Sequence, residues 1–353
     1  MNDDGLFEYV GNLHIHSSFS DGSATVIDIA HLAAKAGLDF IIFNDHDYLT
    51  DALHLEAESF YGEVLVLMGL EIGKMSHHYL AYDLKEMVKS GASTPQEIID
   101  LVNAQGGFGF LAHPFEKGMP FHDKSITYTW KDLTVTDFTG ICIWNFASRW
   151  KERIKTPLHG ILFLLFKSWS LKGPSRKTTA FWDRLCKQRR VVAIGGSDAH
   201  GSWFRFGPLR LRPLTYEFLL NSINIHILLD RKLPKNYSEA KAEVYRAMRE
   251  GLLFVAHERL APASGFRFHY ISEEGYSLTM GEEGPFQHGN IHIETPLKGE
   301  IRLLRDGTLH KKWYGKRASC WVEQSGVYRV EVYRHFFLFG RRPWIFSNPI
   351  YLR

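Results

Sequence analysis

Up to about residue 260 the chain alternates short, continuous apolar runs with amphipathic segments of helical period. Continuous apolar runs are typical of strands covered on both faces, and their alternation with helices is typical of a parallel sheet flanked by helices. Helices are expected over residues 25–36 and 94–105, the second opening with a capping Thr94 and with Pro95 at its first position. The strand-like runs end at residues 12–16, 40–46, 64–71, 109–113, 141–145 and 191–198. This pattern predicts an α/β fold, either a barrel or a doubly wound sheet.

From about Phe266 onward the helical periodicity disappears. Short alternating runs at 291–294, 301–304 and 327–333 are separated by glycine and proline turns, and Asp306-Gly307 is a strong hairpin signal. Such spacing predicts a small all-β sandwich with an aromatic core. We therefore expect two domains, residues 1–262 and residues 263–353.

Length and composition allow this arrangement and narrow the function classes. A chain of 353 residues and 40.7 kDa can form a barrel-sized domain and a smaller one. The net charge of +3 is far below that of a typical nucleic-acid binder, so no nucleic-acid partner is expected. Three widely separated cysteines indicate a reducing compartment. With no signal-peptide core and no apolar run long enough to span a bilayer, the expectation is a cytoplasmic protein without a transmembrane segment.

Histidines and carboxylates recur at the ends of the expected strands. His14 and His16 are two residues apart on one strand, so both imidazoles should face one side and grip the same ion. In a parallel barrel the carboxyl ends of the strands meet at one mouth, where active sites form. This mixture of ligands suits Zn, Mn or Fe. The residues that end or follow an apolar run are His46, Glu71, His113, Asp198 and His200, and Asp21 lies in the loop after the first strand.

Each of these residues has an ordinary structural explanation when taken alone. A single histidine at a strand end is more often hydrogen-bonded within the fold than bound to a metal. Asp21 with Gly22 fits a turn, and Asp198 fits a helix N-cap. Their recurrence at equivalent strand ends is what favours a shared metal site.

The same residues resemble the ordered motifs of the PHP (polymerase and histidinol phosphatase) superfamily over roughly residues 10–260. The resemblance implies a distorted (β/α)7 barrel similar to a TIM barrel, a site for up to three divalent ions (Mn, Fe or Zn), and hydrolysis of phosphomonoesters or phosphodiesters. The motifs are Leu13-His-Ile-His-Ser17 with Ser20-Asp-Gly22, Asn44-Asp-His46, Gly69-Leu-Glu71, Ala112-His-Pro114 and Gly196-Ser-Asp-Ala-His200.

The resemblance also implies how the ligands divide. One ion would be held by His14, His16, Glu71 and Asp198, a second by Glu71, His78 and His113, and a third by Asp21, His46 and His200. His78 is preferred to His77 because His78-Tyr-Leu-Ala matches the family pattern. Asn44 stands where many members have Thr, and residues 342–351 resemble the β-sandwich tail of one subgroup.

The mechanistic hypothesis is a metal-activated hydroxide, formed between ions bridged by Glu71, that attacks phosphorus in line. Asp198 or His200 would relay a proton to the leaving group. The expected partner is a small phosphorylated substrate, and the candidate contacts to it are Asn145, Arg149 and Arg205.

Two alternatives for the function stay open, an amide, ester or carbamate hydrolase that uses the same site and a metal-binding regulatory module. The basic stretch 150–177, with its apolar run 161–166, is expected to be a buried helix. A lid, a membrane-surface helix and a homo-oligomer contact are the alternatives for this stretch.

Overall fold

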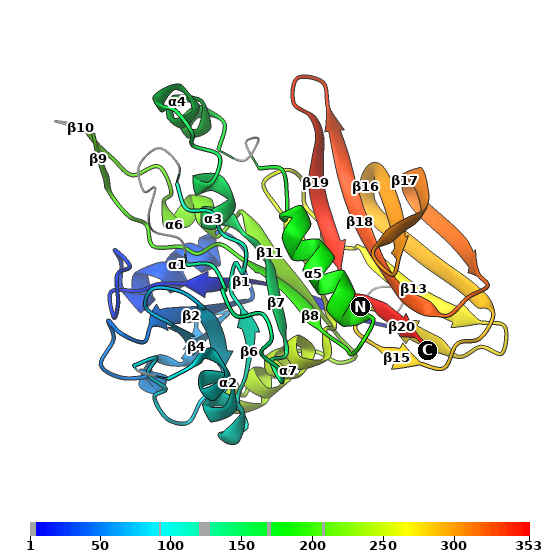
Figure 1. The fold of residues 1–353 in the computed structure, drawn as a ribbon, viewed down its shortest axis with the longest axis horizontal. Helices are drawn as coiled ribbons and strands as arrows, with labels where there is room; N and C mark the ends of the chain where they lie inside the picture. Colours follow the sequence, from blue (N-terminus) through cyan, green and yellow to red (C-terminus); the bar gives the residue numbers. More distant parts are fainter. Residues whose placement is uncertain (1–4, 92, 120–127, 168–170, 207–208) are drawn as a thin grey trace.

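The computed structural model describes residues 5–91, 93–119, 128–167, 171–206 and 209–353, without the side chains of 157, 204–206 and 209. They form a mixed α/β structure built on one large, strongly twisted sheet (Figure 1). The helices are α1 (Val26–Lys35), α2 (Pro95–Ala104), α3 (Phe146–Lys151), α4 (Pro157–Leu165), α5 (Arg176–Cys186), α6 (Tyr216–Leu219) and α7 (Tyr237–Glu250), with a 3-10 turn at Leu55–Ala57.

The strands of the first part are β1 (Phe7–Ile15), β2 (Phe40–His46), β3 (Ser59–Tyr61), β4 (Val64–Ile72), β5 (Tyr79–Tyr82), β6 (Phe108–Leu111), β7 (Gly140–Asn145), β8 (Val192–Gly196), β9 (Phe204–Phe206), β10 (Leu209–Leu211), β11 (Ile223–Leu229) and β12 (Leu253–His257). Those of the second part are β13 (Arg267–Ser272), β14 (Ser277–Thr279), β15 (Glu283–Gly284), β16 (Gly289–Arg305), β17 (Thr308–Val322), β18 (Gly326–Phe336), β19 (Gly340–Ser347) and β20 (Ile350–Leu352).

The strands that carry the site residues follow one another in the sheet. β1, β2 and β4 pair in parallel, as do β6, β7 and β8, whereas β5 pairs antiparallel with both β4 and β6. The α/β class is confirmed, but the expected wholly parallel sheet is wrong. The short β5 returns directly from β4 through a loop instead of a helix, so it must run the other way.

The other edge of β1 is shared between two partners. Most of it pairs antiparallel with β11, which pairs in turn with β12. At its carboxyl end, the backbone N–H groups of Ser197 and Ala199 donate to Leu13 and His14, and His16 donates to Ala199. These bonds bring the end of β8 against β1, although the strands themselves do not pair as a ladder. A closed seven-stranded barrel therefore stays a prediction.

The two expected helices are present, as α1 and α2. Thr25 caps α1 by accepting from the backbone N–H of Asp28. Thr94 and Glu97 form a reciprocal capping box at the start of α2, with Pro95 in its first turn. Both helices bury one apolar face against the sheet and so hold the strand ends in place.

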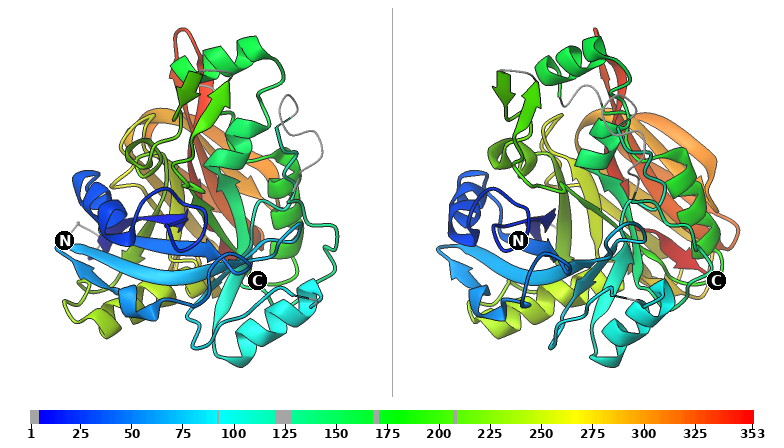
Figure 2. Two further views of the ribbon diagram at one scale, coloured as in Figure 1. Left: turned by 90° about the vertical axis from the view of Figure 1, so that its left-hand side faces the viewer. Right: turned by 60° about the vertical axis from the view of Figure 1, so that its left-hand side comes forward.

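The second part of the chain is almost entirely antiparallel β-structure with a separate apolar core. The Asp306-Gly307 hairpin is confirmed as the turn between β16 and β17, with both residues at positive φ (52° and 79°). The sheet is continuous with the first part, because β19 pairs with β12. Figure 2 shows this part packed beside β8, β12 and α5. A sandwich architecture and the boundary at residue 262 remain predictions.

The expectation of a buried helix within 150–177 is wrong for α4. Leu158, Ile161 and Leu165 are 64%, 58% and 71% exposed, and the helix projects from the body of the protein (Figure 1). Because α4 projects away from the sheet, these apolar side chains face the solvent instead of packing against it. Among the described residues no helix is both long and apolar enough to cross a membrane.

Candidate metal centre

Nine histidines and carboxylates converge where the strands of the first part end. All except His14 and His16 line a cavity of about 330 Å³. Seven of them are buried, whereas the Asp21 side chain (41% exposed) and His200 (19%) lie nearer the solvent. The nine residues are His14, His16, Asp21, His46, Glu71, His78, His113, Asp198 and His200.

His14 and His16 face the same carboxylates, Glu71 and Asp198, as expected. The cause is not the two-residue repeat of a regular strand but an irregularity at the end of β1. His14 sits at φ 62°, in the left-handed region, and the β1–β2 register shifts there between Leu13 and Ile15. This bulge turns the His14 side chain toward the cavity beside that of His16. Non-glycine residues at positive φ are strained and often mark functional sites, and Asp198 (φ 54°) and His113 (φ 28°) share the property.

Glu71 lies at the centre of the cluster. Its Oε2 is 3.0 Å from His14 Nε2, 3.3 Å from His16 Nε2 and 3.4 Å from His46 Nδ1. Its Oε1 is 2.6 Å from His78 Nδ1 and 3.2 Å from His113 Nε2. A carboxylate that faces imidazoles with both oxygens is suited to bridge two cations.

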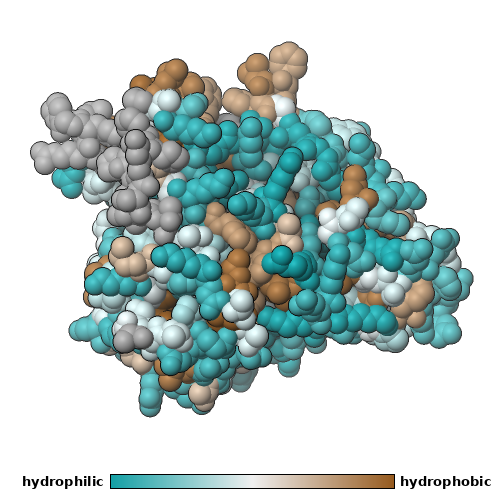
Figure 3. All heavy atoms as spheres, viewed as in Figure 1, coloured by the Kyte–Doolittle hydropathy of each residue, from teal (hydrophilic) through white to brown (hydrophobic). Residues whose placement is uncertain are grey.

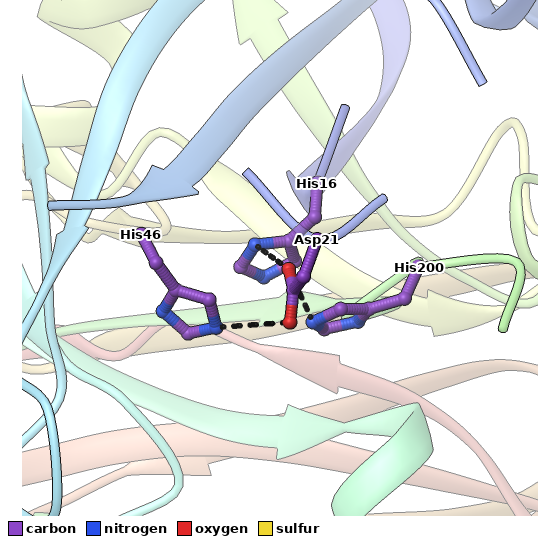
Figure 4. Close-up of side chains that lie close together, drawn as sticks. All are labelled: His16, Asp21, His46 and His200. Atoms are coloured by element: carbon purple, nitrogen blue, oxygen red, sulfur yellow. Dashed lines mark ion pairs between the residues drawn. The ribbon is translucent and has the colours of Figure 1, made fainter. Parts of the chain in front are cut away.

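A second group lies toward the solvent and is shown in Figure 4. Asp21 Oδ1 is 3.4 Å from His200 Nε2 and 3.7 Å from His16 Nδ1, and Asp21 Oδ2 is 3.8 Å from His46 Nε2. The loop that carries Asp21 depends on Gly22, because a Cβ there would lie 2.1 Å from the His16 carbonyl oxygen. Asp21 therefore reaches the cluster through a tight turn that glycine makes feasible.

His78 and His113 lie within hydrogen-bond distance of Glu71, but the longer separations in the cluster fit metal ligation better than direct hydrogen bonding. Two ligands about 2.1 Å from one ion in tetrahedral geometry are about 3.4 Å apart. His14 Nε2 and His16 Nε2 are each 3.5 Å from Asp198 Oδ1. Several of these buried imidazole nitrogens have no hydrogen-bond partner among the described atoms, a costly state unless something else occupies the space. They are His14 Nε2, both nitrogens of His16, His46 Nδ1 and His78 Nε2.

Three groups of residues have ligand atoms close enough to hold one ion each. The first, His14, His16, Glu71 and Asp198, coincides with one implied ligand set. The second contains the implied third set, with His16 added to Asp21, His46 and His200. The third places His46 with Glu71 and His78, where the resemblance implies His113.

The charges of the cluster are strongly coupled. Burial opposes ionisation of Glu71, but His14, His78 and His46 outweigh it and hold the Glu71 pKa well below its usual range. Asp198 shows the same balance, with His14 and His16 lowering its pKa. Burial would lower the pKa of His16, yet the facing carboxylates of Asp198 and Glu71 raise it to about 10. For His46, burial outweighs the opposite effect of Glu71 and lowers the pKa to about 2. The carboxylates of Glu71 and Asp198 are thus ionised, which is the form that binds cations.

The proposed substrate contacts are placed differently from the ligands. Asn145 is buried, caps α3, and its Nδ2 lies 3.4 Å from His14 Nδ1. Arg149 pairs with Glu152 and donates to the Gly173 carbonyl 2.9 Å away. Both border a smaller space behind His113, away from the main cavity. Arg205 lies in β9, and its side chain is outside the described residues.

The structure supports His78 over His77. His77 Nε2 accepts from the backbone N–H groups of Lys131 and Asp132, so it is occupied outside the cluster.

Several residues of the site escaped the sequence reasoning. Glu116 is buried and its Oε2 is 3.1 Å from His113 Nδ1, the position of a carboxylate that orients a metal-binding histidine. The Tyr216 hydroxyl lies 2.7 Å from the His16 carbonyl oxygen and 2.9 Å from that of His200. A carboxylate three residues after His113 was the one signal available in the sequence.

Among the described residues, Lys151 is the one lysine that lines the main cavity. Burial would lower its pKa, but Asp198 and Glu116 outweigh this and raise it. Within the described part of the chain, its ammonium group has no hydrogen bond or ion pair within 4 Å. Tyr48 and Tyr128 line the same cavity.

Three solved structures show low similarity to the chain. A two-domain protein from Bacteroides vulgatus that contains a predicted PHP-like metal-dependent phosphoesterase is 14% identical, with a TM-score of 0.46 over 98% of this chain and 96% of that one. A candidate metal-dependent phosphoesterase from Bifidobacterium adolescentis is 16% identical, with a TM-score of 0.29 over 54% and 87%. An amidohydrolase from Chromobacterium violaceum with bound sulfate and no metal is 15% identical, with a TM-score of 0.29 over 57% and 98%.

No curated protein matches the chain. The model of the PHP domain, in contrast, matches residues 12–149. This range includes seven of the nine clustered residues, all except Asp198 and His200. Over residues 12–149, the chain is therefore similar to the PHP domain family.

Proposed function

We propose that the protein is a metal-dependent hydrolase, specifically a phosphoesterase with a site for up to three divalent ions (Mn, Fe or Zn). The observation that carries the proposal is the set of buried imidazole nitrogens without hydrogen-bond partners that face the ionised carboxylates of Glu71 and Asp198. Burying so many polar groups without hydrogen-bond partners is costly unless a ligand occupies the space between them. The PHP domain match supports the same conclusion.

The proposal includes the finer architecture. The strands β1, β2 and β4 to β8 would form a distorted barrel within residues 1–262, completed by the backbone bonds of Ser197 and Ala199 to β1. Residues 263–353 would be a β-sandwich domain. The first ion would bind His14, His16, Glu71 and Asp198, the second Glu71 and His78 with His113, and the third Asp21, His46 and His200.

Bound divalent ions would supply Lewis acidity and lower the pKa of water at the site. Glu71 offers one oxygen to each of two neighbouring ligand groups, so it would set their separation. Asp198 and His200, whose Oδ1 and Nδ1 are 3.4 Å apart, would pass a proton toward the leaving group. Glu116 would hold the His113 ring in one orientation.

Lys151 favours an anionic substrate. An ammonium group facing a cavity without an ionic partner is suited to a phosphoryl oxygen, as a point charge. A neutral amide or carboxylic ester would leave this charge unused. For this reason a phosphoester is preferred to the other substrates of a metal-dependent hydrolase.

The test is hydrolysis by protein reconstituted separately with Mn, Fe and Zn. The panel contains phosphomonoesters, phosphodiesters and carboxylic esters with the same chromogenic leaving group. We expect phosphoester turnover that follows metal content and is absent in a His14→Ala/His16→Ala variant. Preferential turnover of the carboxylic esters, or equal phosphoester turnover in the variant after metal removal, would contradict the proposal.

A further inference from the structure

Three segments project from the same end of the protein. They are α4 with Phe166, the segment formed by Trp203 and the paired strands β9 and β10, and the tip of the β18–β19 hairpin at residues 337–339. Figures 1 and 2 show them together at the top of every view, and the rings of Phe166 and Phe339 are 5.6 Å apart. We call these three segments the apical surface.

The apical surface exposes large apolar side chains at its projecting points. Phe337 is fully exposed, Leu338 is 80% exposed and Trp203 is 51% exposed. On α4, Leu158, Ile161 and Leu165 point outward. Figure 3 shows apolar surface at the crests of α4 and the β18–β19 hairpin. Such clustering of exposed apolar residues in a folded protein marks a contact surface.

The surrounding charge is positive. Residues 150–177, which include α4, contain seven Lys or Arg residues, one of them the cavity-lining Lys151, and a single acidic residue, Glu152. Residues 201–215 and 334–343 contain three Arg residues each and no acidic residue. The whole chain is nearly balanced, with 42 basic and 39 acidic residues, so this excess is local. Two nearby acidic residues are already in ion pairs, Glu152 with Arg149 and Glu300 with Arg341.

We propose that the apical surface docks the protein on a membrane that contains anionic lipids. The projecting apolar side chains could insert shallowly between lipid headgroups, and the basic residues beside them would attract anionic headgroups. α4 has nine residues and would lie in the interface plane. A second copy of the chain is a poorer occupant, because two surfaces with the same positive charge would face each other.

Docking would hold the cavity close to the lipid layer. Gly201 and Ser202 line the cavity and directly precede Trp203 in the apical surface. This part of the inference concerns location only, and docking does not depend on the phosphoesterase proposal.

The experiment is sedimentation of the full-length protein with vesicles, using phosphatidylcholine alone and phosphatidylcholine with about one third phosphatidylglycerol. We expect binding to the anionic vesicles and little binding to the neutral ones. Raising the salt from about 0.1 M to about 1 M shortens the Debye length from about 10 Å to about 3 Å and should weaken the binding. Absence of binding to anionic vesicles at low salt would overturn the proposal.

Variants separate the apolar and the charged contributions. Ile161→Ser/Leu165→Ser and Phe337→Ser/Leu338→Ser should each lower the partition coefficient roughly tenfold or more. Lys155→Glu/Arg210→Glu should lower binding to anionic vesicles only. The matched control is Ile27→Ser/Leu101→Ser, which removes exposed apolar side chains from α1 and α2 (54% and 48% exposed) and should bind as the wild type does.

Unchanged thermal unfolding and metal content will show that the variants are folded. Equal loss of binding in the control would overturn the proposal, as would undiminished binding in both apical apolar variants. Sedimentation velocity supplies an independent outcome. A dimer that Ile161→Ser/Leu165→Ser dissociates would assign the apical surface to a second copy of the chain and overturn docking on membranes.

Discussion

Lys151 differs from the other cations near the cavity, because Arg149 is already paired with Glu152. Its charge is stabilised at longer range by Asp198 and Glu116, which leaves the ammonium free to contact a substrate. We predict that Lys151→Met lowers kcat/KM for a phosphoester about 10- to 100-fold, whereas Lys151→Arg retains most of the activity. Steady-state kinetics with metal analysis provides the check. A matching loss of bound metal would show that Lys151 serves the metal ligands instead.

Glu116 acts on the cluster through His113. Its removal leaves His113 Nδ1 without the partner that orients the ring. We predict that Glu116→Gln weakens binding of the weakest-held ion about 10- to 100-fold. Titration of metal-free protein with Zn, followed by calorimetry, measures this. The exposed Glu86→Gln serves as a control and should bind metal like the wild type.

The clustering of individual histidines and carboxylates could be predicted because the geometry of parallel strands brings their ends together. His46, Glu71 and His113 follow apolar runs, and this position alone placed them in one cluster. Lys151 and Glu116 carry no such mark, since they come from a short helix and a loop whose course depends on the rest of the fold. Arg149 was placed near the cavity by sequence proximity, but the turn of α3 directs it toward Gly173.

At the scale of elements, the site depends on the irregular end of β1 and the loop after it. The loop returns to the strand closely enough that the Gly22 amide donates to the Ser17 carbonyl 2.9 Å away. We predict that Gly22→Ala lowers the free energy of unfolding by about 1–3 kcal/mol and displaces Asp21. Urea unfolding and metal stoichiometry measure the two effects.

Gly160→Ala is the matched control for this change. A Cβ at Gly160 would meet only Ile154 Cγ2, at 3.8 Å, and alanine favours the helical conformation of α4. Its stability should equal or exceed that of the wild type. If Gly22→Ala retained full stability and all of its metal, the loop would not be the constraint on Asp21.

Helices and strands were predicted where the sequence shows a clear capping signal or a long apolar run. α2 was marked by its capping Thr94 and the proline that follows it, and β2 and β4 by apolar runs. The bulge at His14 was not foreseen, because a register shift leaves no trace in a pattern of alternating residues. The short β5 was also missed, because four residues are too few to show a recognisable strand pattern.

At the scale of the whole molecule, the two parts of the chain are joined by buried charges as well as by the β12–β19 pairing. Arg329 in β18 pairs with Asp183 in α5 (Nε–Oδ1 2.7 Å), and Arg267 in β13 pairs with Glu8 in β1 (2.7 Å). The change of texture near residue 266 coincides with the start of β13, after which the structure contains strands and no helix up to residue 353. It could not show how the parts are joined, because charge pairs between distant segments leave no local pattern.

One of these charged groups makes the stability of the molecule depend on pH. His226 in β11 is fully buried between Glu8 and Glu258, at 2.7 Å and 2.9 Å, with Arg267 and Asp39 close to the same acids. Burial would lower its pKa, but hydrogen bonds to Glu258 and Glu8 outweigh it and raise the pKa to about 9. The stabilisation is therefore complete below pH 6.5, the ordinary value, and is lost as the pH rises through about 9.

We predict that the wild type loses up to about 3 kcal/mol of unfolding free energy across this interval through His226, because each unit of pKa shift corresponds to about 1.4 kcal/mol. His226→Gln should be less stable at pH 6.5 by roughly 3–5 kcal/mol, since Glu8 and Glu258 lose a buried partner. The variant should also lack this part of the pH dependence, so the two stability curves should converge toward pH 9. Chemical unfolding of metal-loaded protein at several pH values provides the curves. The exposed His335→Gln should parallel the wild type, and parallel curves for His226→Gln would show that His226 is neutral in the folded protein.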